Sequence, residues 1–230
     1  MDFSKLPDYR DGTNSGLSDF TKFLIANFSL PRENVLYELL PGGENLLDLG
    51  SGYGEFCNLA TDKYKHVYGI DYSQERTEYA TAHYKDVTFY EEDLNNMPLD
   101  FSNNYFDAIT SLVTLDWVYD LNSLLSEVYR ILKPNGLFVF EVSNLGFILR
   151  RFQLLFGKYP KVSSISEKEW KRLGWDYSVC HLFTKKVLVD FLKEFNFSPI
   201  KITGNGIFRS LRTWYPSLLC GDLIFVCRKL

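Results

Sequence analysis

"LLDLGSGYGEF", Leu46–Phe56, is an apolar run that leads directly into glycines at positions 50, 52 and 54. Glycine loses more backbone entropy on folding than any other residue, so three at alternate positions indicate a tight turn that a ligand approaches. Asn45–Leu49 is predicted to be a short buried strand, and the residues after Gly54 suit a helix. In open α/β sheets, ligands bind at the carboxyl ends of such strands. We therefore expect a polar ligand here, held by bare backbone N–H groups and the helix N-terminus.

The spacing of the glycines separates two classes of ligand. Dinucleotide-binding turns have the form Gly-x-Gly-x-x-Gly. This chain has Asp48-x-Gly50-x-Gly52-x-Gly54, and Glu55 stands where the third dinucleotide glycine would fall. The turn resembles that of class I S-adenosylmethionine-dependent methyltransferases. The resemblance implies S-adenosyl-L-methionine as cofactor and S-adenosyl-L-homocysteine as product, and it disfavours a dehydrogenase.

Two further predicted strands also end in acids. "HVYGID" ends at Asp71, where a carboxylate can accept charge-assisted hydrogen bonds from both ribose hydroxyls. The other predicted strand, "VTFYEED", ends at Asp93. In the family this position holds the adenine, through the acid side chain and the next backbone N–H. The resemblance thus assigns a cofactor site made of Asp48, Gly50, Ser51, Gly52, Gly54, Asp71, Tyr72, Asp93 and Leu94.

The resemblance extends to the small-molecule, type 11 branch of the family. It rests on "NNMPLDFSNNYFDAITSLVTLDWV" (95–118) and "LLSEVYRILKPNGLFVFEV" (124–142), with a fourth strand from Phe106 and a fifth after the Lys133–Gly136 turn. It implies an α/β, Rossmann-like, seven-stranded, mostly parallel sheet with helices on both faces. The last strand, expected at 222–228, would be antiparallel. With 230 residues, 46% of them hydrophobic, one domain over 1–230 is the simplest organisation.

Three apolar stripes at helical spacing are expected to be core. One follows Asp120, a predicted N-cap, and one begins at Pro31. The third follows Thr184. The stripes comprise Leu121, Leu124, Leu125, Val128, Ile131 and Leu132; Val35, Leu36, Leu39 and Leu40; and Val187, Leu188, Phe191, Leu192 and Phe195.

Composition narrows the location and the partners. The four cysteines are far apart and there are three histidines, so we expect no metal site. Residues 1–10 lack the apolar core of a signal peptide, and no run of about 20 apolar residues could span a bilayer. We expect a reduced, cytoplasmic protein. A formal net charge of −4 provides no general attraction to nucleic acid. The oligomeric state stays open.

The acceptor site is expected beyond the fourth strand. Methyltransferases of base amines carry Asn/Asp-Pro-Pro-Tyr/Phe there, whereas this chain has "SLVTLDWVYD" (111–120). We place Asp116, Trp117 and Tyr177 in the acceptor pocket, where Trp117 either forms an aromatic wall near the sulfonium or packs on a helix.

Two additions to the common core are expected on the substrate side, at about 145–182 and 206–220. The first alternates Phe147, Phe152 and Phe156 with Arg150 and Arg151. Such a segment could cover the pocket, meet an anionic acceptor, rest on a membrane surface, or dock as a surface helix on its own sheet.

His181 is the candidate catalytic base, because an alcohol must lose a proton and imidazole titrates near neutral pH. The alternative is a histidine at a helix entry that only hydrogen-bonds backbone. The segment His181-Leu182-Phe183-Thr184 resembles one in methyltransferases of glycan assembly and secondary metabolism. That likeness favours an oxygen acceptor on a sugar, a lipid-linked compound or another small polar metabolite. The alternatives are C- or N-methylation of a quinone precursor or other ring, and a catalytically inactive cofactor-binding scaffold.

Overall fold

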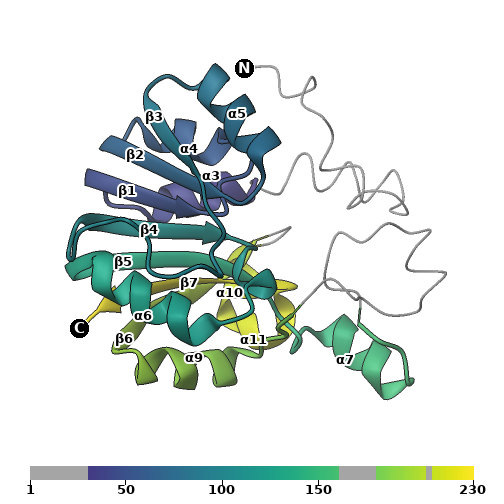
Figure 1. Cartoon of the computed structure of the whole chain (residues 1–230). Coiled ribbons are helices and arrows are strands. Elements are labelled where there is room, and N and C mark those ends of the chain that lie inside the picture. The colour runs from purple at the N-terminus through teal and green to yellow at the C-terminus, as the bar shows by residue number, and fades with distance from the viewer. Residues whose placement is uncertain (1–30, 161–179, 206–208) are drawn as a thin grey trace.

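A computed structural model describes residues 31–160, 180–205 and 209–230 (Figure 1). Tyr177 and most of the first predicted addition beyond residue 160 lie outside the described residues. In chain order the elements are α3 (Arg32–Leu39), β1 (Gly43–Leu49), α4 (Glu55–Ala60), β2 (Tyr64–Asp71), α5 (Gln74–His83), β3 (Val87–Glu91), β4 (Phe106–Leu112), the 3-10 helix η2 (Leu115–Trp117), α6 (Leu121–Ile131), β5 (Leu132–Ser143), α7 (Ile148–Leu155), α9 (Lys185–Glu194), β6 (Phe197–Thr203), α10 (Arg209–Trp214), α11 (Pro216–Leu219) and β7 (Asp222–Lys229).

One seven-stranded sheet with the order β3-β2-β1-β4-β5-β7-β6 forms the centre of the molecule. The pairs among β1 to β5 are parallel, and β7 is antiparallel to both of its neighbours. The predicted fold class is confirmed, including the antiparallel last strand. The strand order reverses between β1 and β4, and such a switch point opens a crevice at the carboxyl ends of the strands.

Strand bounds differ from the predictions mainly where pairing continues past the apolar run. β1 begins at Gly43. The Gly43 N–H donates to the carbonyl oxygen of Lys63, the residue just before β2. β5 begins at Leu132, before the predicted turn, because Leu132 pairs with Phe106 ahead of a register shift. β3 ends at Glu91 and therefore does not include Asp93.

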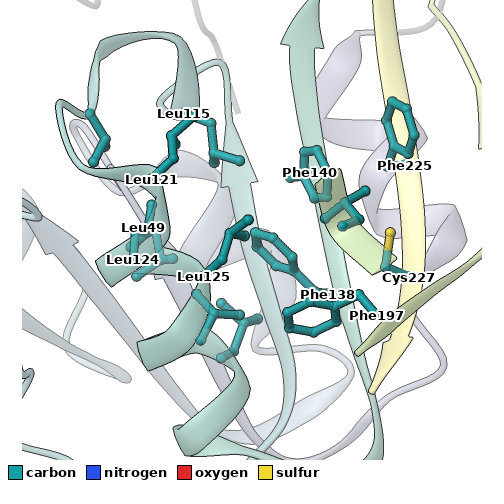
Figure 2. Close-up of a cluster of buried hydrophobic side chains, with 14 of the residues drawn as sticks. Leu49, Leu115, Leu121, Leu124, Leu125, Phe138, Phe140, Phe197, Phe225 and Cys227 are labelled. Carbon is teal, nitrogen blue, oxygen red and sulfur yellow. The ribbon is translucent and has the colours of Figure 1, made fainter. Parts of the chain in front are cut away.

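The face of the sheet covered by α6 and α9 holds the larger apolar cluster (Figure 2). The α6 stripe is buried as predicted, and the Asp120 carboxylate caps the helix by accepting from the N–H groups of Asn122 and Ser123. In α9, Leu188 and Leu192 are buried but Val187 is 61% exposed, so the prediction that Val187 is core was wrong. Val187 lies in the first turn, away from the side of the helix that carries Leu188 and Leu192.

The opposite face is covered by α3, α4 and α5 (Figure 1). Val35 and Leu36 of α3 pack with Phe56 and Ala60 of α4 over the apolar side chains of β1 and β4. Among the described residues, no helix combines the length and the apolar character needed to cross a bilayer.

Candidate functional site

The glycine turn between β1 and α4 is held against β2 by its own backbone. The N–H groups of Gly50 and Ser51 both donate to the carbonyl oxygen of Ile70, at 2.8 Å each. The N–H of Gly52 donates to the Asp71 carboxylate at 2.9 Å. These three N–H groups therefore have partners inside the protein, which corrects the expectation that the turn presents them bare to a ligand.

The three glycines share a positive φ but have two different roles in the turn. All have positive φ, at 77°, 56° and 88° for Gly50, Gly52 and Gly54. A Cβ on Gly50 would lie 2.1 Å from Oγ1 of Thr114, and one on Gly54 would lie 2.6 Å from the Phe89 ring. A Cβ on Gly52 would meet no atom of the described residues within 4 Å. Gly50 and Gly54 thus permit close packing, and Gly52 alone faces open space that a ligand can occupy.

Asp71 stands at the end of β2 beside this open space. Its side chain is 4% exposed; Oδ2 accepts from Gly52, and Oδ1 accepts from the N–H of Ser73 at 3.0 Å. Arg76 lies 3.7 Å from Oδ2. Each carboxylate oxygen can accept more than one hydrogen bond, so both keep capacity for a ribose hydroxyl. Tyr72 follows at the mouth of the site and is 70% exposed.

Asp48 is directed into the protein. Its Oδ1 accepts from Oγ1 of Thr110 on β4 at 2.7 Å, and the Cys57 thiol of α4 approaches Oδ2 at 3.7 Å. Burial raises the pKa of Asp48 to about 6. Asp48 therefore ties β1 to β4 and α4 directly beneath the glycine turn.

Asp93 lies two residues past the end of β3 and is exposed. Its Oδ1 accepts from the backbone N–H and the side-chain amide of Asn95, at 2.9 and 2.8 Å. The Leu94 side chain is buried in the core. The sheet order β3-β2-β1 brings Asp93, Asp71 and the glycine turn to one edge, as the sequence predicts for a cofactor that crosses these strands.

Asp116 of η2 connects this short helix to the end of β5 and to the segment that holds His181. It is 1% exposed, and its Oδ2 accepts from the backbone N–H of Ser143 at the end of β5 at 3.1 Å. Its carbonyl oxygen accepts from the N–H groups of Cys180 and His181, at 2.8 and 3.1 Å. Oδ1 is buried with no hydrogen-bond partner among the described residues. Burial raises the pKa of the Asp116 carboxyl to about 7, against the hydrogen bonds from Ser143.

The structure brings Asp116 and His181 together and orients the imidazole. Nε2 of His181 lies 2.8 Å from the carbonyl oxygen of Val118 and 3.3 Å from that of Tyr119. Carbonyl oxygens only accept, so Nε2 carries the proton and the lone pair of a neutral ring is on Nδ1. Trp117, the last residue of η2, is 40% exposed.

Sequence reasoning missed Thr114 and Glu141. Thr114 packs against Gly50 and so links the loop after β4 to the glycine turn. Glu141 is completely buried in β5, and Arg32 of α3 lies 3.4 Å from its Oε2. The signal for Glu141 is an acid inside the apolar strand sequence "LFVFEV".

The first addition begins with α7, which projects from the sheet beyond β5 (Figure 1). Both of its arginines donate to backbone carbonyl oxygens, although Arg151 remains exposed. The Arg150 guanidinium donates to the carbonyl oxygens of Asn144 and Gly221, and Nε of Arg151 donates to that of Gly146. The segment also exposes several large apolar side chains, namely Leu149, Phe152, Leu154, Leu155 and Phe156, beside the exposed Arg151 and Lys158.

The comparisons with known proteins agree with this geometry. The type 11 family model, described as a methyltransferase domain, matches residues 47–140, which run from β1 to β5. Residues 47–140 form a type 11 methyltransferase domain. A solved S-adenosylmethionine-dependent methyltransferase from Mesorhizobium loti superposes with a TM-score of 0.63 over 85% of this chain and 96% of its own, at 22% identity. That likeness shows a shared fold.

Two curated relatives match parts of the chain around this methyltransferase domain. A probable S-adenosylmethionine-dependent methyltransferase from Mycolicibacterium smegmatis is 26% identical over 61% of this chain and 53% of its own length. A ubiquinone/menaquinone biosynthesis C-methyltransferase (UbiE) from Desulfotalea psychrophila is 36% identical over 42% of this chain and 40% of its own. The chain thus spans about half the length of the first and less of the second.

The site of the methyltransferase domain fits the cofactor that the family implies, S-adenosylmethionine. Gly52 leaves room for a group directly over the turn, and Asp71 offers carboxylate oxygens beside that room. Gly52 follows β1, one of the two strands at the switch point, and Asp71 ends the neighbouring strand β2. In this arrangement Asp71 would hold the ribose, and Asp93 would lie at the adenine end.

Proposed function

We propose that the protein transfers a methyl group from S-adenosylmethionine to a small-molecule acceptor, at an oxygen of a sugar, lipid-linked or other small polar metabolite. The observation that carries the proposal is the pairing of open space at Gly52 with the Asp71 carboxylate. It lies within a domain that matches the methyltransferase family.

The chain's own residues have separate tasks in this proposal. S-adenosylmethionine, when bound, supplies a methyl group that is already electrophilic because it is attached to a sulfonium. Asp71 and the turn at Gly52 position the cofactor, so that transfer depends mainly on orientation of the acceptor. His181 would draw the proton from an acceptor hydroxyl through Nδ1, since Nε2 is held by Val118.

A carbon acceptor is the second candidate, because one curated relative is a C-methyltransferase. A nitrogen acceptor belongs to the same alternative. A cofactor-binding scaffold without catalysis would keep Asp71 but would transfer no methyl group to any acceptor.

A membrane-borne acceptor is favoured by one specific observation. Exposed aromatic and aliphatic side chains on and after α7, such as Phe152 and Phe156, form an apolar surface beside the sheet. Such side chains can enter the boundary between lipid headgroups and acyl chains. We retain a cytoplasmic location within the proposal, supported by four cysteines that are all free thiols.

The test is a screen of candidate acceptors with S-adenosylmethionine labelled in the methyl group. Alcohols, amines, ring carbons and lipid-linked sugars are offered separately, and the product that gains label is identified by mass. Labelled methyl on an oxygen supports the proposal. Label on carbon or nitrogen favours the second candidate, and cofactor binding without transfer across the screen favours the scaffold.

A further inference from the structure

A buried carboxyl group with unused hydrogen-bonding capacity lies near the end of β5. Glu141 has a relative exposure of 0%, and neither Oε1 nor Oε2 accepts a hydrogen bond among the described residues. Arg32 approaches Oε2 at 3.4 Å as an ion pair. Buried carboxylates in proteins are normally both paired and hydrogen-bonded, so these two oxygens lack the partners that burial demands.

The sheet register places further polar groups beside Glu141. Glu141 pairs with Ile224 of β7, and Ile224 pairs in turn with Thr203 of β6. Residues paired directly across strands share a face, so Glu141 and Thr203 stand on the side covered by α3. Oγ1 of Thr203 is also buried and has no hydrogen-bond partner among the described residues. Two residues along, Ser143 pairs with Asp222, which lies on the same face.

Carboxyl groups outnumber guanidinium groups in this cluster. Among the described residues, the charges that act on Glu141 are those of Arg32, Asp222, Glu33 and Asp116, and only the first is positive. Arg150 is 3.7 Å from Asp222 and also donates to two carbonyl oxygens. Burial and the neighbouring acids raise the pKa of Glu141 to about 8, although Arg32 opposes the rise. A further cation would relieve this cluster.

The cluster adjoins the proposed cofactor site. Asp116 contacts the end of β5 through Ser143, and Thr114, two residues earlier, packs on Gly50 of the glycine turn. Both β4 and β5 present their carboxyl ends here, next to the switch point where ligands of open α/β sheets bind. In the sheet register Glu141 pairs with Leu112, one residue beyond the Leu49–Ser111 pair that precedes Gly50, so it lies level with the start of the glycine turn.

We propose that Glu141, assisted by Asp116, binds an ammonium group of the methyl acceptor. This inference rests on the proposed function and adds a substrate class to it: acceptors that carry an amine, whichever atom is methylated. An ammonium has N–H donors for the two oxygens of Glu141 and for Oδ1 of Asp116, which are the orphaned acceptors. A carboxylate acceptor would instead bring a like charge to buried acids and is expected to be rejected.

The experiment uses the full chain saturated with S-adenosylhomocysteine, which occupies the cofactor site without turnover. Primary amines, primary alcohols and carboxylates built on the same small scaffolds are the probes, and stabilisation is read as a thermal shift. We expect the shifts to be concentrated in the amine series. In Glu141→Gln and in Asp116→Asn, which keep side-chain size, amine affinity should fall at least tenfold. Asp190→Asn, which removes an exposed acid on α9, should leave it unchanged.

Equal shifts in the three series, no shift in any of them, or preference for carboxylates would overturn the inference. So would amine affinity that survives both substitutions. Calorimetric binding of S-adenosylhomocysteine to the wild-type chain keeps the two proposals apart. If the cofactor product binds and an alcohol lacking any amine is methylated, the substrate class is wrong and the proposed function stands. If it does not bind, the proposed function itself fails.

Discussion

Oδ2 of Asp71 lies 2.9 Å from the backbone nitrogen of Gly52 and accepts its hydrogen bond. The side chain proposed to hold the ribose therefore also holds the one glycine of the turn that faces open space. Cofactor binding and the conformation of the turn thus depend on the same carboxylate. A substitution at Asp71 should therefore alter the turn, and one at Gly52 should alter the position of the Asp71 side chain.

Asp71→Asn should weaken binding of S-adenosylhomocysteine at least tenfold. The amide keeps the size and one acceptor oxygen but loses the charge, and hydrogen bonds to charged groups contribute about 1.5–3 kcal/mol each. Isothermal calorimetry measures the effect, with Asp190→Asn as the control at an exposed acid. Affinity equal to that of the wild type would show that Asp71 does not hold the ribose.

Two alanine substitutions in the turn should distinguish a residue that leaves room for the cofactor from one that permits close packing within the protein. Gly52→Ala places a methyl group in open space, so its main structural cost is the positive φ, about 1–2 kcal/mol, while cofactor affinity falls. Gly50→Ala places a methyl group 2.1 Å from Thr114 and should lower the melting temperature more. Thermal unfolding and calorimetry are run on both. Normal cofactor binding by folded Gly52→Ala would contradict the proposed cradle.

His181→Ala should lower methyl transfer to the identified acceptor by about 10²–10⁴-fold, the usual contribution of a positioned acid or base. Cofactor affinity should not change. His181→Gln is the matched variant, because its amide can still donate to the Val118 carbonyl but has no basic nitrogen. Should the glutamine variant turn over at nearly the wild-type rate, His181 only positions the loop.

Glu141 should make the protein less stable as the pH rises. Burial raises the pKa of Glu141 from 4.5 to about 8, so folding favours the protonated acid. A group of this kind contributes stability that is present below the unfolded pKa and is lost as the pH rises through the folded pKa. Between about pH 5 and 8, the wild-type melting temperature should fall more than that of Glu141→Gln. If the melting temperatures of the two proteins change equally with pH across this range, Glu141 does not have the raised pKa.

A double substitution, Phe152→Ser with Phe156→Ser, should reduce sedimentation of the protein with anionic vesicles. These rings are 48% and 74% exposed, whereas Arg150 and Arg151 bind backbone carbonyls at the base of α7. Val187→Ser, at an exposed apolar residue of α9, is the control. If the wild-type chain does not sediment with the vesicles, the proposal of a membrane-borne acceptor fails.

Much of the fold was predictable because the relevant signals are local. Positive φ values at the glycines, the Asp120 cap and the apolar stripe of α6 each depend on neighbours within a few residues. Prediction was less successful at Val187, where helical spacing alone did not define how wide the buried stripe of α9 is.

The type of fold, the position of the glycine turn and the order of Asp48, Asp71 and Asp93 could all be read from the amino-acid sequence. Which groups of the turn are available to a ligand depends on long-range contacts, because the N–H partners of Gly50, Ser51 and Gly52 come from β2, about 20 residues further along the chain. The same long-range packing turns Asp48 inward and buries the Glu141 carboxyl without a hydrogen-bond partner among the described residues. Burial and orphaned hydrogen-bonding capacity arise from groups distant in sequence that pack together, and no local spacing encodes them.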